Sequence, residues 1–161
     1  MIWDHIEKLR ECIRGDNWPL PYDQWPEELN DDTNCLAFAL GLTKVDCDYD
    51  SFVSWNPEFP KPKFSAVFER LLNELGFEWR NLENPEKANS DEFIIQIYGF
   101  YKFPFLNDTL LDFHVIRREL DGTWIHKPSF NDSPCKIDFE VFHEEYPDNE
   151  IAGIYAVRKP Q

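Results

Sequence analysis

The sequence lacks any long apolar run. None of its 161 residues belongs to a stretch approaching the roughly 18 consecutive apolar residues that a membrane-spanning helix needs. Its first stretch, MIWDHIEKLRECIRG, mixes charges of both signs and lacks the apolar centre and the small-residue cleavage site of a secretion signal. We therefore expect a cytoplasmic protein that does not associate with membranes.

Basic residues are few. The chain has 16 Lys and Arg against 31 Asp and Glu, which gives a formal net charge of −15. Such a surface repels phosphate backbones, so we expect no direct nucleic-acid binding and favour a basic protein partner. An acidic protein can also occupy a nucleic-acid groove as a mimic, and charge alone does not choose between these partners.

Closely spaced cysteines are also missing. The cysteines at positions 12, 35, 47 and 135 form no C-x-x-C pair, which disfavours a structural zinc site, and four are too few for a disulfide scaffold. In a reducing compartment they are expected to be free thiols. We predict no metal and no other cofactor. A metal site built from Cys35, His114 and His126 is chemically possible, but it lacks a close-spaced ligand pair.

What the sequence does have is enough apolar and aromatic material, 42% and 16%, to build one core over residues 1–161. Apolar residues at helical spacing predict helices over 2–14 and 64–75, with Gly15 ending the first in left-handed geometry and Gly76 stopping the second. A short helix is expected at about 35–41, and 43–63 is expected to be irregular.

Strands are expected to dominate after position 76. The predicted strands are 93–98, 112–119, 123–128, 137–142 and 151–158, and Asp121-Gly122 between the second and third is a hairpin signal. The sequence therefore predicts an α+β fold with N-terminal helices packed on a five-stranded antiparallel sheet.

Cys35 is the residue on which function depends most. Thr33 or Asn34 can cap a helix that begins beside it, and in the first helical turn a thiol has a lowered pKa while free N–H groups can hold an oxyanion. The amide of Asn34 could contribute to that oxyanion site. Cysteine is also among the most buried residue types, so an unreactive core position is the alternative.

A nucleophilic cysteine usually needs a base, and His114 lies within a predicted strand. Alternation puts its side chain opposite Phe113 and Val115. His126 is the first candidate for orienting its imidazole, but the face of His126 depends on the hairpin: a two-residue loop turns it away from His114, and a three-residue loop with a bulge brings it to the same face. Asp132 and Asn131 are rival orienting residues.

The segments NCLAFALG and DFHVIRRELDGTWIHKP resemble a pattern in uncharacterised bacterial and phage proteins of the papain-like, NlpC-type superfamily. There an Asn-Cys-aromatic-Ala helix start precedes an Asp-aromatic-His strand and a Gly-x-Trp-x-His-Lys-Pro segment. The resemblance implies a papain-like fold, with Cys35 as nucleophile, His114 as base and His126 as third member. This chain departs from the pattern at Leu36 and Ser129.

Two functions are therefore expected from different classes. The first is a thiol hydrolase or acyltransferase acting on an amide, peptide or related acyl bond, with a cytosolic protein target. The second is an acidic non-enzymatic binding or inhibitor protein of the phage type on the same fold, with the aromatic loops 18–25 and 52–59 as its surface. A binder should tolerate Cys35→Ala, and an enzyme should not.

Overall fold

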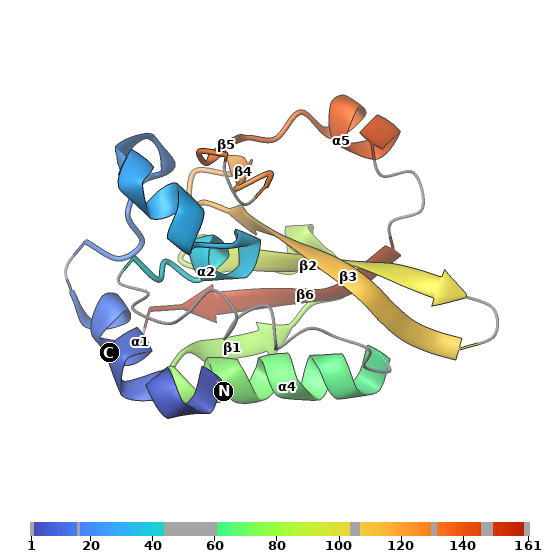
Figure 1. Cartoon of the computed structure of the whole chain (residues 1–161), viewed down its shortest axis with the longest axis horizontal. Helices are drawn as coiled ribbons and strands as arrows, with labels where there is room; N and C mark the ends of the chain where they lie inside the picture. Colours follow the sequence, from blue (N-terminus) through green and yellow to red (C-terminus); the bar gives the residue numbers. More distant parts are fainter. Residues whose placement is uncertain are drawn as a thin grey trace.

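The fold is α+β, with an open six-stranded antiparallel sheet in the order β1-β6-β2-β3-β4-β5 (Figure 1). The computed structural model describes residues 2–15, 17–43, 61–103, 107–129, 132–145 and 150–159. The strands are β1 (Glu78–Asn81), β2 (Phe93–Phe103), β3 (Asn107–Arg118), β4 (Trp124–His126), β5 (Cys135–Lys136) and β6 (Glu150–Arg158). The helices are α1 (Ile6–Arg14), α2 (Cys35–Ala39), α4 (Lys61–Glu74) and α5 (Phe139–Glu145), with 3₁₀ turns at Ile2–His5, Tyr22–Gln24, Glu27–Asp32 and Pro85–Lys87.

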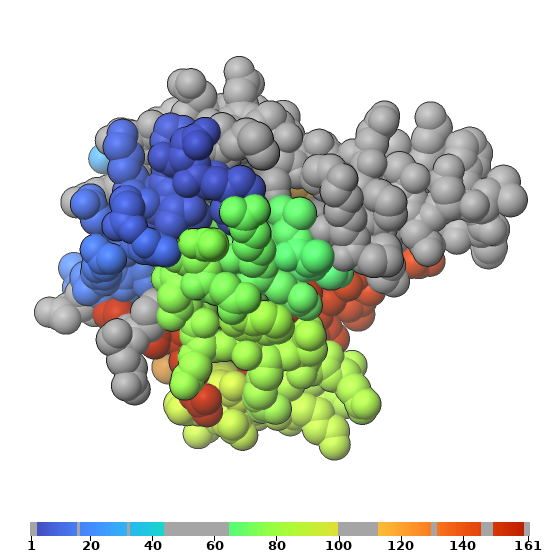
Figure 2. All heavy atoms as spheres, turned by 90° about the horizontal axis from the view of Figure 1, so that it is seen from below, coloured from blue at the N-terminus to red at the C-terminus, as the bar shows by residue number. Residues whose placement is uncertain are grey.

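Helices α1 and α4 lie side by side, as Figure 2 shows for the blue and green segments. The Arg10 guanidinium of α1 donates to the backbone carbonyl of Glu74 in α4 at 2.5 Å and reaches its carboxylate at 3.3 Å. The guanidinium of Arg70 lies 4.0 Å from the Trp3 ring centroid. Apolar side chains of both helices turn toward the sheet, because their helical spacing gathers them on one side of each helix.

The predicted helices are confirmed with altered ends. Gly76 follows α4 with a φ of +83°, as expected of a glycine stop. The prediction for Gly15 is wrong: its φ of −71° and ψ of 158° are extended, so α1 ends without a left-handed residue. Residues 44–60, which include most of the predicted irregular segment and the aromatic loop 52–59, lie outside the described residues.

The predicted strand over 137–142 is wrong, because Phe139–Glu145 is the helix α5. The alternating apolar residues of IDFEVF suggested a strand. However, the Asp138 carboxylate accepts from the backbone N–H groups of Glu140 and Val141 at 3.0 and 3.3 Å, which is how a helix N-terminus is capped. Phe139 and Phe142, three apart, then point into the protein while Val141 is exposed.

The sheet therefore has one strand more than predicted. The short strands β1 and β5 have partly exposed residues and no apolar alternation, so their sequences carry no strand signal. Both are added at the edges: β1 pairs with β6, and β5 pairs with β4. The four remaining predicted strands correspond to β2, β3, β4 and β6.

Each face of the sheet carries its own cluster of buried side chains. The larger cluster joins α1, α2 and α4 to one face through residues such as Ile95, Ile97 and Val115. The smaller one joins α5 to the other face through Tyr98, Ile116 and Phe142. Alternation along β2 and β3 explains this division. Within the described part of the chain, none of the helices has the length and apolar character that a membrane span requires.

Candidate functional site at Cys35 and the β3–β4 hairpin

Cys35 is the first residue of α2, as the sequence predicts. The side chain of Asn34 accepts a hydrogen bond from the Ala37 N–H at 2.8 Å, so Asn34 caps the helix. Thr33, the other predicted cap, is buried and its hydroxyl donates to the Leu29 carbonyl instead. Helix α2 has only five residues and aligns few peptide dipoles, so its N-terminus supplies only part of the stabilisation expected for a thiolate.

A buried arginine holds α2 on the sheet. One nitrogen of Arg117 in β3 donates to the carbonyls of Phe38 and Ala39 at 3.0 and 3.1 Å, at the C-terminal end of α2. The other donates to Glu119 at 2.9 Å. Burial lowers the pKa of Arg117, and the Glu119 carboxylate opposes that shift by favouring the charged form. The position of Cys35 therefore depends on a cation inside the core.

The β3–β4 hairpin has the longer of the two loops considered. The Glu119 N–H donates to the Thr123 carbonyl at 2.8 Å, and Gly122 has a φ of +90°. Glu119 is therefore paired with Thr123 across a three-residue loop, with Gly122 in the left-handed conformation that a bulge of this kind requires. This register puts His126 on the same face as His114.

The two histidines form a buried pair. Nε2 of His114 and Nδ1 of His126 are 2.9 Å apart, and the ring planes meet at 79°. The Phe142 ring of α5 lies over both imidazoles, at centroid distances of 5.8 and 6.0 Å. Burial, followed by the charge of His126, lowers the pKa of His114 to about 3, and burial lowers the pKa of His126 to about 4. Both imidazoles are therefore neutral at pH 7.

Cys35 and His114 belong to different faces of the sheet. Cys35 is half-buried and packs against the cluster that contains Val115. His114 points to the opposite side of β3, toward α5. The structure thus brings the two predicted imidazoles together, and Cys35 packs in the cluster on the other face of the sheet. A direct pairing of the Cys35 thiol with His114 stays a prediction from the resemblance.

Lys127 is the ionisable group that the hairpin brings to the side of Cys35. It follows His126, so alternation turns it to the face of α2, where it is completely buried. Its ammonium donates to the Ser129 carbonyl at 2.9 Å. Burial lowers the pKa of Lys127, and the charges of Asp132, Cys35 and Asp31, in that order, act in the opposite direction. Sequence analysis missed this residue, although its place after His126 predicts its face once the loop length is known.

The remaining candidates have structural contacts. Asp132 accepts from the Ser129 hydroxyl at 2.7 Å, in the turn whose Ser129 carbonyl receives the Lys127 ammonium. Asn131 lies outside the described residues. Among the residues that the structure describes, no group of three or more His, Cys, Asp or Glu side chains is arranged to hold a metal ion.

Chemically, the site offers a half-buried thiol and a buried ammonium on one face of the sheet, and a neutral imidazole pair on the other. A cation beside a thiol favours the thiolate, which is the reactive form. Comparison of the chain with family models, with curated proteins and with solved structures found no match.

Proposed function

We propose that this chain is a papain-like thiol hydrolase or acyltransferase that acts on an amide or related acyl bond of a cytosolic protein or peptide, with Cys35 as the nucleophile. The observation that carries the proposal is the place of Cys35 at the capped start of α2, on the side of the sheet where Lys127 is buried; the charge of Cys35 favours the protonated form of Lys127. A positive charge held in an apolar environment lowers the pKa of a neighbouring thiol more than the same charge in water, because little solvent screens it.

In this proposal Lys127 takes the acid–base role that the resemblance gives to His114. The Cys35 thiolate attacks the acyl carbon, a carbon–sulfur bond forms, and the leaving amine takes a proton from the Lys127 ammonium as the carbon–nitrogen bond breaks. Water, or an acceptor amine, then gives a proton to the Lys127 amine and attacks the thioester, and the carbon–sulfur bond breaks to release the Cys35 thiolate. The lowered pKa of Lys127 supports this role, because proton transfer is most efficient when the group titrates nearer to the working pH.

The pH dependence of Cys35 alkylation by iodoacetamide tests the proposal, read by mass spectrometry with Cys12 and Cys135 as internal references. We expect Cys35 of the wild type to react below pH 7, where the references do not. Lys127→Met should move its reaction to higher pH, and Lys127→Arg should restore part of it, because the charge alone favours the thiolate.

The matched variant His114→Gln separates the two partners. If it leaves the Cys35 profile unchanged, Lys127 is the partner of the thiol. If His114→Gln raises the thiol pKa and Lys127→Met does not, the cysteine–histidine pair implied by the resemblance is the correct one. If Cys35 reacts no faster than Cys12 and Cys135, the thiol is a core residue and the enzymatic proposal is refuted.

The second candidate function is an acidic binding protein that does not use the thiol. The net charge of −15 favours it, since a basic partner would be attracted from a distance. Cys35→Ala distinguishes the two functions, because a binding protein retains its partner after this substitution and a thiol enzyme loses its activity.

A further inference from the structure

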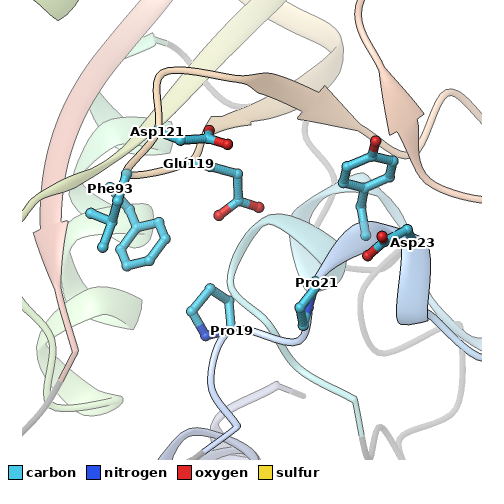
Figure 3. Close-up of a pocket in the computed structure, with 8 residues that line it drawn as sticks. Pro19, Pro21, Asp23, Phe93, Glu119 and Asp121 are labelled. Atoms are coloured by element: carbon cyan, nitrogen blue, oxygen red, sulfur yellow. The ribbon is translucent and has the colours of Figure 1, made fainter.

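A pocket of about 410 Å³ lies at the end of the sheet where the β3–β4 turn meets the loop before the Tyr22–Gln24 turn. Figure 3 shows it between Phe93 on one side and Asp23 on the other. The volume is in the range of ligand-binding pockets. The residues that line it are Pro19, Pro21, Tyr22, Asp23, Phe93, Glu119, Leu120 and Asp121.

The walls of the pocket come from elements that the core holds in place. Trp18 is buried, and its indole N–H donates to the Leu40 carbonyl at 2.8 Å, which fixes the start of the 19–23 loop. The ring of Phe93, at the beginning of β2, packs edge-on against Trp18 at 5.4 Å. The opposite wall is the hairpin turn, closed by the hydrogen bond between Glu119 and Thr123. The backbone that forms the pocket is therefore held in place by hydrogen bonds and by packing against the core.

The carboxylates of Asp23, Glu119 and Asp121 line the pocket together with its apolar residues. Glu119 points into the middle of the space, as Figure 3 shows. One of its oxygens is bound by Arg117 at 2.9 Å, and its side chain is 19% exposed, so the carboxylate is oriented from behind while it still faces the opening. Asp23 is exposed and has no hydrogen-bond or ion-pair partner among the described residues. Among the residues that the structure describes, no Lys, Arg or His lines the pocket.

Asp121 keeps its charge at neutral pH. The Thr123 N–H donates to its carboxylate at 2.9 Å, and this bond, with a smaller effect from the charge of Lys136, lowers its pKa. Glu119 and Asp121 thus each accept from a described partner, the Arg117 guanidinium and the Thr123 N–H, and Asp23 has none among the described residues. The site combines flat apolar surfaces with an unbalanced negative charge.

We propose that this pocket binds an arginine side chain presented by a basic protein partner. A guanidinium is planar and weakly hydrated, so it stacks on a ring such as that of Tyr22 while donating to carboxylates such as Glu119 and Asp23. The lysine ammonium is compact and strongly hydrated, and it would leave the flat walls unused. The net charge of −15 attracts a basic partner to the whole surface of the protein, this face included. The pocket then defines the position at which one arginine of that partner binds. The site does not depend on Cys35.

Binding of a labelled peptide, Gly-Ala-Arg-Ala-Arg-Ala-Gly, followed by fluorescence anisotropy and by NMR shifts, tests this site. We expect the peptide to shift the resonances of Phe93 and Leu120, and the same peptide with citrulline for arginine to bind at least about tenfold more weakly, because it keeps the shape and loses the charge. Asp23→Asn should weaken the arginine peptide about tenfold. Asp23 is used because its substitution breaks no described contact, whereas Glu119→Gln also removes a partner of Arg117.

The matched control is Glu83→Gln, which removes the same charge from an exposed position away from the pocket. Equal weakening by Asp23→Asn and Glu83→Gln would mean that the peptide senses only the overall charge, and the pocket would be refuted. If the same peptide with lysine in place of arginine binds as tightly as the arginine peptide, the recognition of a guanidinium is refuted. If arginine amide alone binds as tightly as the peptide, the ligand is a small cation and the protein partner is refuted. The binding is measured on Cys35→Ala as well, so that failure of the thiol proposal leaves this result unaffected.

Discussion

The buried pair of His114 and His126 should make the protein sensitive to mild acid. Both imidazoles are neutral in the fold, with pKa values of about 3 and about 4, whereas the ordinary value is 6.5. The hydrogen bond between them requires one ring to donate and the other to accept. A proton added to either ring places a charge in a buried site that solvates it poorly. Acid should therefore favour the unfolded chain.

The magnitude follows from the difference in bound protons. A group whose folded-state pKa is lowered has no effect above pH 6.5, and its cost grows as the pH falls from 6.5 toward the folded-state value. At pH 5 a histidine of the unfolded chain is protonated and the native pair is not. For each histidine this lowers the free energy of unfolding by about 1.4 kcal/mol per pH unit, over the roughly 1.5 pH units between 6.5 and 5. Each imidazole therefore contributes about 2 kcal/mol, and the pair about 4 kcal/mol. This is a large part of the 5–15 kcal/mol that holds a typical domain folded.

Urea unfolding followed by tryptophan fluorescence at pH 7.5 and at pH 5.0 measures this loss. His126→Gln retains one titrating imidazole, so the variant should lose about 2 kcal/mol less than the wild type between the two pH values. His143→Gln is the control, because His143 is exposed on α5, and it should leave the loss unchanged. If wild type and His126→Gln lose the same stability on acidification, the pair is not held neutral and the reasoning is refuted.

The remaining predictions concern the attachment of α2. Arg117→Met should cost about 3 kcal/mol of unfolding free energy, because the α2 carbonyls lose a buried donor; a loss under 1 kcal/mol in urea unfolding would show that Arg117 does not hold the helix. Gly41→Ala should cost about 2 kcal/mol or more and lower the melting temperature, since the glycine φ is +69° and an added Cβ would lie 2.3 Å from the Trp18 indole nitrogen. Asn34→Ala should cost about 1 kcal/mol by removing the cap, and Asn34→Asp should restore most of it in the same assay.

The parts of the fold that could be predicted are those with a strong local signal. Helix α4 and the central strands follow from the periodicity of their apolar residues, and the hairpin follows from Asp121-Gly122. Helix α5 could not be read in this way, because a run of alternating apolar residues is compatible with a strand until the cap at Asp138 is recognised. The edge strands β1 and β5 owe their conformation to pairing with a neighbour, which leaves no trace in their own sequences.

The candidate site was predictable in its parts and not in its arrangement. The cap at Asn34 and the start of α2 at Cys35 follow from residue type. The face of each imidazole follows from alternation along its strand, but sequence alone does not say which face α2 covers. That choice is made by Arg117, whose buried guanidinium binds the carbonyls of α2 on the side opposite His114. A buried arginine in a strand is uncommon enough that its position could have indicated the face of a helix end.

The length of the β3–β4 loop decides which chemistry each face carries. With a two-residue loop, His126 would lie opposite Arg117, on the side of α2 and Cys35, and Lys127 would turn toward His114. The three-residue loop shifts the register by one, so His126 lies opposite Ile116 and joins His114, and Lys127 is buried on the side of Cys35. One residue at a turn, Gly122 in the left-handed conformation, therefore puts the imidazole pair on one face and the Lys127 ammonium on the face of Cys35. The adjacent His126 and Lys127 serve opposite faces because the strand alternates. For this reason, similarity of the sequence around His126 and Lys127 to a known motif would identify both residues but would not tell which of them lies on the face of Cys35.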